Sequence, residues 1–96
     1  MRIRYSSRAQ RDLEEICSYI ERENPRAAAR VRREIVATIL LLSANPFIGT
    51  KNVRAPELRS YPLKRYPYRV HYEIKKEEFI VLHIRHGARS STGWPP

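Results

Sequence analysis

The feature that most constrains the fold is Asn24-Pro25, where one helical pattern stops and a second one starts. Asparagine is a favoured N-cap and proline suits the first helical position, so a new helix begins here. Apolar or small residues recur at helical spacing on both sides of this break: Ala9, Leu13, Ile16, Cys17 and Ile20 before it, and Ala28, Val31, Ile35, Ile39 and Leu42 after it. Two helices separated by about one turn form an antiparallel hairpin.

The outer ends of this hairpin also carry signals. Ser7, with Gln10 three residues later, forms a capping-box pattern that opens the first helix. The second helix must stop before Asn45-Pro46, because a residue that precedes proline avoids the helical region. Asp12 lies among charged residues that fall mostly off the apolar stripe of the first helix.

Short segments in which apolar and polar residues alternate flank the hairpin. Residues 2–6 predict a half-buried strand, and three more strands are expected over about 57–63, 68–75 and 79–85. A loop is expected over 46–56, and the sequence KKEE is the polar connection between the last two strands. The predicted order is β-α-α-β-β-β. It gives an α+β fold, with the helical hairpin on one face of a small antiparallel sheet. We expect one domain over residues 1–96, with 89–96 as a flexible tail.

Alternation in the last two strands assigns side chains to faces. Six apolar residues are expected to face the helices: Val70, Tyr72, Ile74, Ile80, Leu82 and Ile84. Arg69, His71, His83 and Arg85 then share the opposite face, which we expect to be polar, basic and open. Such a face is suited to a polyanionic partner.

The charge balance also favours an anionic partner. Nineteen Lys and Arg residues oppose ten Asp and Glu residues, giving +9, and 15 of the nineteen are arginine. Residues 51–96 hold ten basic and four acidic residues (+6), whereas residues 1–50 hold nine and six (+3). The arginine fork suits bidentate contact with phosphate or carboxylate. A basic C-terminal half therefore indicates a polyanionic or acidic partner. The alternative is a solvated basic face that binds nothing.

Other functional classes find little support. The single cysteine, Cys17, gives no internal disulfide framework and fits a reducing cytosol. The longest apolar run, residues 35–44, is far shorter than the roughly 20 residues that span a bilayer, and no secretory leader opens the chain. We therefore expect a cytoplasmic protein that is not bound to a membrane. No metal-ligand spacing or phosphate-binding glycine loop occurs, so no metal or cofactor is expected.

Three segments in order, residues 9–35, 45–74 and 79–89, resemble toxins of the ParE/RelE superfamily from type II toxin–antitoxin modules. The resemblance implies a growth inhibitor held inactive in a hetero-oligomer by a small cognate antitoxin, ParD-like or similar. RelE-like members cleave messenger RNA on the ribosome. ParE-like members are associated with poisoning of DNA gyrase and with plasmid stabilisation.

The residues favour the ParE-like branch. RelE-like nucleases take cations from a Tyr-Arg pair and a Gly-x-Arg turn, which match Tyr68-Arg69 and Gly87-Ala88-Arg89. They also carry lysines on the preceding strand and a tyrosine or histidine beyond the turn. Here residues 57–63 hold no lysine, and residues 90–96 offer only Trp94, which cannot exchange a proton at neutral pH. Two cations without these groups are better suited to binding than to cleaving RNA.

These arguments predict three residue sets. The target-binding set is Arg59, Arg69, His83, Arg85 and Arg89. If the protein is instead an mRNA endonuclease with an altered residue set, the catalytic residues are Arg69, Arg89 and His86. Val36 and Leu40 widen the apolar stripe of the second helix, which predicts an antitoxin docking surface unless the first helix and the sheet cover them. A degenerate, non-toxic binding module is the third possibility.

Overall fold

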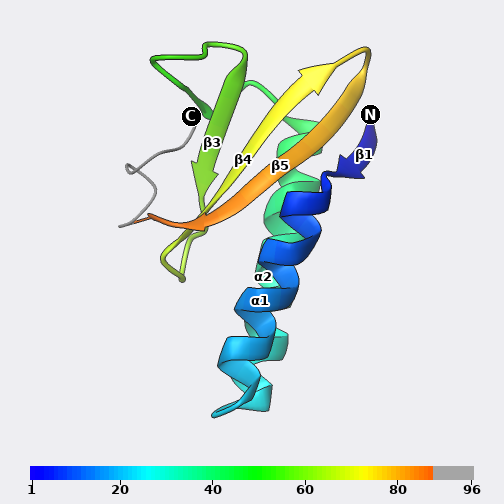
Figure 1. Cartoon of the computed structure of the whole chain (residues 1–96). Helices are drawn as coiled ribbons and strands as arrows, with labels where there is room; N and C mark the ends of the chain where they lie inside the picture. The colour runs from blue at the N-terminus through cyan, green and yellow to red at the C-terminus, as the bar shows by residue number, and fades with distance from the viewer. Residues whose placement is uncertain (88–96) are drawn as a thin grey trace.

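A computed structural model of the chain describes residues 1–87, in which two helices pack with a five-stranded sheet (Figure 1). The elements are β1 (Arg2–Tyr5), α1 (Ser7–Glu21), α2 (Pro25–Ala44), β2 (Thr50–Lys51), β3 (Leu58–Pro62), β4 (Tyr68–Lys75) and β5 (Glu78–His86). The expected α+β fold is confirmed. Neither helix in this part of the chain has the length and apolarity needed to cross a bilayer.

The helical hairpin begins and ends close to the predicted positions. Asn24 caps α2 by accepting a hydrogen bond from the backbone N–H of Ala27 at 3.0 Å, and Pro25 is the first helical residue. The N-cap of α1 is Ser6 and not the predicted Ser7. The Ser6 hydroxyl accepts from the N–H of Ala9 at 2.9 Å and donates to the carbonyl of Leu82 at 2.8 Å. Ser6 therefore caps the helix and joins it to β5.

The sheet has the order β1-β5-β4-β3-β2. The pairs β3–β4 and β4–β5 are antiparallel, as predicted, and so is β2–β3, whereas β1 pairs with β5 in parallel and makes the sheet mixed. The parallel pair is possible because the two strands are far apart in sequence, and the long connection between them returns the chain to the same end of the sheet. The two-residue strand β2 lies inside the segment predicted as loop.

The core lies between α2 and one face of the sheet, which we call the core face. From the sheet it contains Val70, Tyr72, Phe79, Val81 and Ile84, and from α2 it contains Val31, Ile35, Ile39 and Leu42. The inward prediction is confirmed for Val70, Tyr72 and Ile84, and Ile74 is half-buried. It is wrong for Ile80 and Leu82, because Phe79 and Val81 occupy the core in their place.

A β-bulge explains this difference. Tyr72 pairs with Val81, but its neighbour His71 pairs with His83, so Leu82 is an extra residue in β5. The extra residue shifts the alternation of β5 by one position. Phe79 and Val81 face the core before the bulge, and Ile84 faces it after the bulge.

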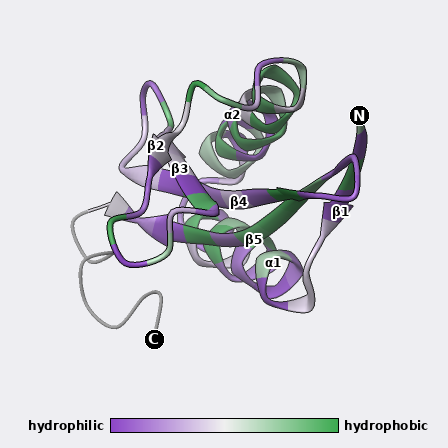
Figure 2. Ribbon diagram, turned by 90° about the horizontal axis from the view of Figure 1, so that it is seen from above, coloured by the Kyte–Doolittle hydropathy of each residue, from purple (hydrophilic) through white to green (hydrophobic). Residues whose placement is uncertain are grey.

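Helix α1 lies along the part of the β5 edge that β1 does not pair with. Strand β1 pairs only with residues 78–81 of β5, and α1 lies beside the remainder of β5, as seen from above in Figure 2. The carboxylate of Asp12 accepts a hydrogen bond from the backbone N–H of Ile84 at 2.9 Å. Asp12 is only 6% exposed, although the charged residues around it fall mostly off the apolar stripe of α1. The residue satisfies a backbone donor at a strand edge that would otherwise be unpaired.

Candidate functional site

The sheet surface opposite the core, which we call the outer face, gathers polar residues from β3, β4 and β5. Arg69 is paired with Arg85, and His71 is paired with His83, so the four predicted residues do share one face. Ser60 of β3 joins them because it is paired with His71. The bulge is required for this grouping, because it places His83 and Arg85 on the outer face although Phe79 and Val81 face the core.

The two histidines are buried, which corrects the expectation of an open face. His71 is 8% exposed and His83 is 3% exposed, and their ring centroids are 6.2 Å apart. The pKa of His71 is lowered from 6.5 to about 4, chiefly by burial and to a smaller extent by His83, Arg69 and Arg85 nearby. Burial also lowers the pKa of His83, although Asp12 opposes this shift. Both imidazoles are therefore neutral at pH 7.

His83 is held between a carboxylate and a guanidinium. Its Nδ1 is hydrogen-bonded to Oδ2 of Asp12, and its Nε2 accepts from Nη1 of Arg85 at 3.3 Å. Nε of Arg8 donates to the other oxygen of Asp12 at 3.3 Å. His83 was predicted to touch the target, but its 3% exposure leaves it a supporting position beneath Arg85. Sequence reasoning missed Asp12, because its partners lie on a strand more than 70 residues away.

Arg69 is held in a different way. Its Nε and Nη2 both donate to the hydroxyl of Ser60, at 3.2 and 3.1 Å. The side chain is half-buried, and a neutral acceptor fixes its direction without cancelling its charge. Arg69 and Arg85 therefore form a pair of oriented cations on the outer face.

Arg59 does not belong to this group. It is paired with Tyr72, so it projects on the core side of the sheet. Its Nη1 donates to the carbonyls of Phe47 and Gly49 at 3.2 and 2.9 Å, and its guanidinium lies 5.2 Å from the ring centroid of Phe47. Arg59 thus holds the loop that follows α2.

Two of the residues suggested for RNA cleavage, Arg69 and His86, lie on opposite faces of the sheet. His86 is paired with Tyr68, and their rings make an edge-to-face contact with centroids 5.7 Å apart. Tyr68 packs against the core cluster, so His86 projects from the face opposite to Arg69. The third member, Arg89, and the proposed flexible tail over 89–96 lie outside the described residues.

Comparison with known proteins identifies the family. Residues 3–91 match the family described as ParE toxin of type II toxin-antitoxin system, parDE. The chain belongs to the ParE toxin family. It is 36% identical over 94 residues to "Putative toxin Y4kP" of Sinorhizobium fredii (strain NBRC 101917 / NGR234), covering 98% of this chain and 93% of that protein.

Solved structures agree with this assignment. A chain of the chromosomal ParDE toxin–antitoxin system from P. aeruginosa superposes with a TM-score of 0.78 at 25% identity, covering 90% of this chain and 95% of that one. The isolated E. coli RelE toxin gives a TM-score of 0.67 at 18% identity, with 93% and 86% coverage. The likeness to RelE concerns the fold alone. The chain is thus a ParE-family member of a type II toxin–antitoxin system.

In this ParE-family toxin the two apolar residues singled out on α2 are exposed. Val36 is 38% exposed and Leu40 is 56% exposed, so neither α1 nor the sheet covers them. The adjacent Leu41 is 46% exposed and borders an open groove of about 630 Å³ between α2 and β3. Tyr61 and Leu63 line the other side of this groove. An apolar strip therefore runs along α2 beside a hollow.

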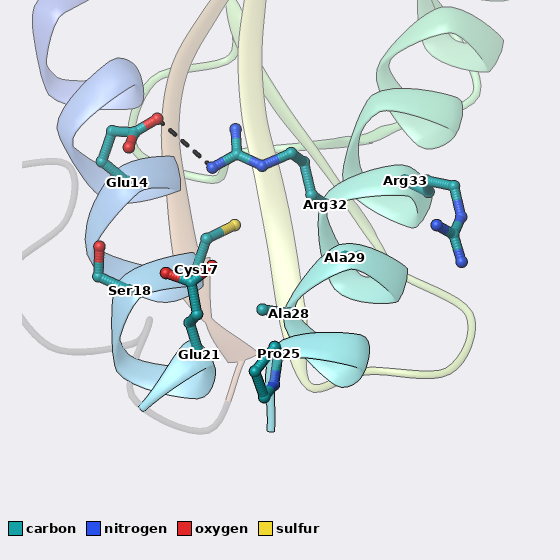
Figure 3. A pocket seen from close by; sticks show the side chains of 9 residues that line it. All are labelled: Glu14, Cys17, Ser18, Glu21, Pro25, Ala28, Ala29, Arg32 and Arg33. Carbon is teal, nitrogen blue, oxygen red and sulfur yellow. Dashed lines mark ion pairs between the residues drawn. The ribbon is translucent and has the colours of Figure 1, made fainter. Parts of the chain in front are cut away.

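A second hollow of the ParE-family fold lies between the two helices (Figure 3). An ion pair of 3.5 Å between Glu14 and Arg32 spans it, and Ala28 lines the α2 side. Cys17 lines the other side and is only 6% exposed, and burial raises the pKa of its thiol. Within residues 1–87 no group of three His, Cys, Asp or Glu side chains is arranged to hold a metal ion.

Proposed function

We propose that this ParE-family toxin inhibits growth by binding a macromolecular target through Arg69 and Arg85, without cleaving a substrate. The observation that carries the proposal is the pairing of these two oriented cations across β4 and β5. Cations alone suffice to hold an anionic partner. RNA cleavage also needs a proton acceptor and a proton donor at the phosphate. His71 and His83 are buried and neutral, and His86 projects from the opposite face.

We propose DNA gyrase as the target, because poisoning of gyrase is the activity that resemblance to ParE-like toxins implies. Arg89 stays in the proposed contact surface with Arg69 and Arg85. His83 leaves the contact surface for a supporting role, and Arg59 leaves it because Phe47 and Gly49 engage its guanidinium. The proposed place of action is the cytoplasm.

The proposed partner in the inactive state is a cognate antitoxin, in a hetero-oligomer. An amphipathic helix of the antitoxin would lay its apolar side on Val36 and Leu40, next to the groove lined by Leu41. The net charge of +9 favours an acidic antitoxin segment and fast association. The P. aeruginosa neighbour comes from a ParDE system, which is consistent with such a partner.

Expression from a tightly controlled promoter tests the target. We expect growth arrest, inhibited gyrase supercoiling with purified protein, and intact messages in the arrested cells. Site-specific message cuts that vanish in Arg69→Ala would overturn the proposal in favour of a ribosome-dependent endonuclease. Unaffected growth would indicate a degenerate module.

Co-expression with the protein encoded by the neighbouring reading frame tests the antitoxin surface. Leu40→Asp is expected to keep growth inhibition but escape neutralisation, because a charge replaces the apolar contact. Tyr19→Asp is the matched control, since Tyr19 is 72% exposed on α1, away from the strip on α2. Equal neutralisation of the two variants would place the antitoxin elsewhere.

A further inference from the structure

Asp12 is the single aspartate of the chain and connects α1 to the outer face. Its carboxylate contacts three donors, one each from Arg8, His83 and Ile84. A buried carboxylate is costly unless such donors surround it. The Ile84 contact closes the strand edge. The His83 contact adds nothing to the edge and leads instead toward Arg85.

The chemistry of the neighbours determines the tautomer of His83. A guanidinium has donors only, so Nε2 of His83 must be an unprotonated acceptor to receive the bond from Arg85. The one proton of the neutral ring is then on Nδ1, where the Asp12 carboxylate accepts it. The carboxylate thereby selects the tautomer that presents a lone pair to Arg85.

We propose that Asp12 and His83 are positioning residues that hold the Arg85 guanidinium in place for the target, through the relay Asp12–His83–Arg85. This inference rests on the proposed function, in which Arg85 contacts the target. A comparison with Arg69 supports it, because Ser60 gives that guanidinium an uncharged acceptor of the same kind. Each guanidinium thus donates to a neutral acceptor that sets its direction.

Asp12→Leu, with Asp12→Asn as its matched control, is the most informative substitution. Oδ2 of Asp12 contacts both the N–H of Ile84 and Nδ1 of His83, so an asparagine with its amide oxygen at that position keeps the strand edge closed and the proton of His83 on Nδ1. Leucine has a similar volume and no acceptor, so the proton of His83 is no longer held on Nδ1 and moves to Nε2. We expect growth inhibition about tenfold weaker in Asp12→Leu, corresponding to one lost hydrogen bond to a charged group, and within about threefold of the parent in Asp12→Asn. Thermal unfolding should stay cooperative in both variants.

A matched pair at His83 separates the two ends of the relay. The amide of His83→Gln lies near the position of Nε2, so it keeps an acceptor for Arg85. The amide of His83→Asn lies near Nδ1, so it keeps the Asp12 contact and loses the Arg85 acceptor. We expect His83→Gln to retain growth inhibition within about threefold and His83→Asn to lose about tenfold. Arg8→Gln is the control within the cluster, because it removes a donor to Asp12 without touching His83. It should inhibit growth like the parent.

Nitrogen NMR of the ¹⁵N-labelled full chain reads the tautomer directly. The parent and Asp12→Asn should carry the His83 proton on Nδ1, and Asp12→Leu should carry it on Nε2, a change that general loosening of the fold would not produce. A parent proton on Nε2, or a folded Asp12→Leu that inhibits growth fully, would overturn the relay. If Arg69→Ala and Arg85→Ala both leave growth inhibition intact, the proposed function fails. The tautomer measurement then still decides whether the relay exists.

Discussion

The two faces of the β4–β5 hairpin are built from the same strands but use burial for different purposes. On the core face, Tyr72 and Phe79 stack with ring centroids 4.6 Å apart, and both are fully buried. On the outer face, His71 and His83 are nearly as buried but are polar, and they lie beside two arginines. Burial on the core face stabilises the fold. Burial on the outer face keeps His71 and His83 neutral, and the buried His83 accepts a hydrogen bond from Arg85.

The separation of the two faces depends on the extra residue Leu82, so its deletion is expected to have the largest effect. Without the bulge, alternation would turn His83 and Arg85 into the core and turn Ile84 out. We expect no cooperative unfolding transition and a collapsed NMR spectrum. Leu82→Ala keeps the residue count, so it should fold and lose only about 1 kcal/mol. A deletion variant with parental stability would show that the bulge does not set the faces.

The core face is expected to be the next most sensitive. Tyr72→Ala removes a fully buried ring and should lower the free energy of unfolding by about 3–5 kcal/mol in urea titrations. Tyr72→Phe keeps the ring but loses the hydroxyl that donates to Pro46 at 2.7 Å and accepts from Gly49 at 3.1 Å. It should cost about 1–3 kcal/mol. Equal losses in the two variants would mean that the hydroxyl, and not the ring, holds this end of the core.

The fold was largely predictable because its signals are local. Asn24-Pro25 and Asn45-Pro46 mark the ends of α2, and both act through backbone constraints at the position itself. The bulge was not predictable. Residues 79–82 are all apolar, so apolar and polar residues do not alternate in this segment. The sequence therefore does not say whether Phe79 and Val81 or their neighbours face the core.

The candidate site was predictable only in part, for a related reason. Pairing of β4 with β5 follows from the hairpin, so the shared face of Arg69 and Arg85 could be inferred. The roles of Asp12 and His83 depend on where α1 lies against β5, which no local pattern specifies. An acidic residue among other charged residues of a helix gives no sign that a distant strand covers it. Arg59 was misgrouped because its acceptors are in a loop with no sequence signature.

Acidification tests the buried histidines of the outer face. The pKa of His71 is lowered to about 4, so on acidification the unfolded chain takes up its proton first, near pH 6.5. The contribution of neutral His71 to stability is therefore complete above about pH 6.5 and is lost as pH falls toward 4, a decrease on the order of 2–3 kcal/mol. His71→Gln should flatten this slope in urea titrations at several pH values. A parental slope in His71→Gln would assign the effect to other groups.

The smallest effect on stability is expected at the arginines of the outer face. Arg69 is half-buried and bonds only to a hydroxyl among its described hydrogen-bond partners, so Arg69→Ala should change the free energy of unfolding by no more than about 1 kcal/mol. Growth inhibition should nevertheless be lost. Arg54→Ala is the matched control, because it removes the same charge from an exposed loop position. Equal weakening by both variants would show that net charge, and not the direction of Arg69, makes the toxin act. If only Arg69→Ala loses growth inhibition, a residue that contributes little to folding is required for function. The outer face would then serve function, whereas the core face serves stability.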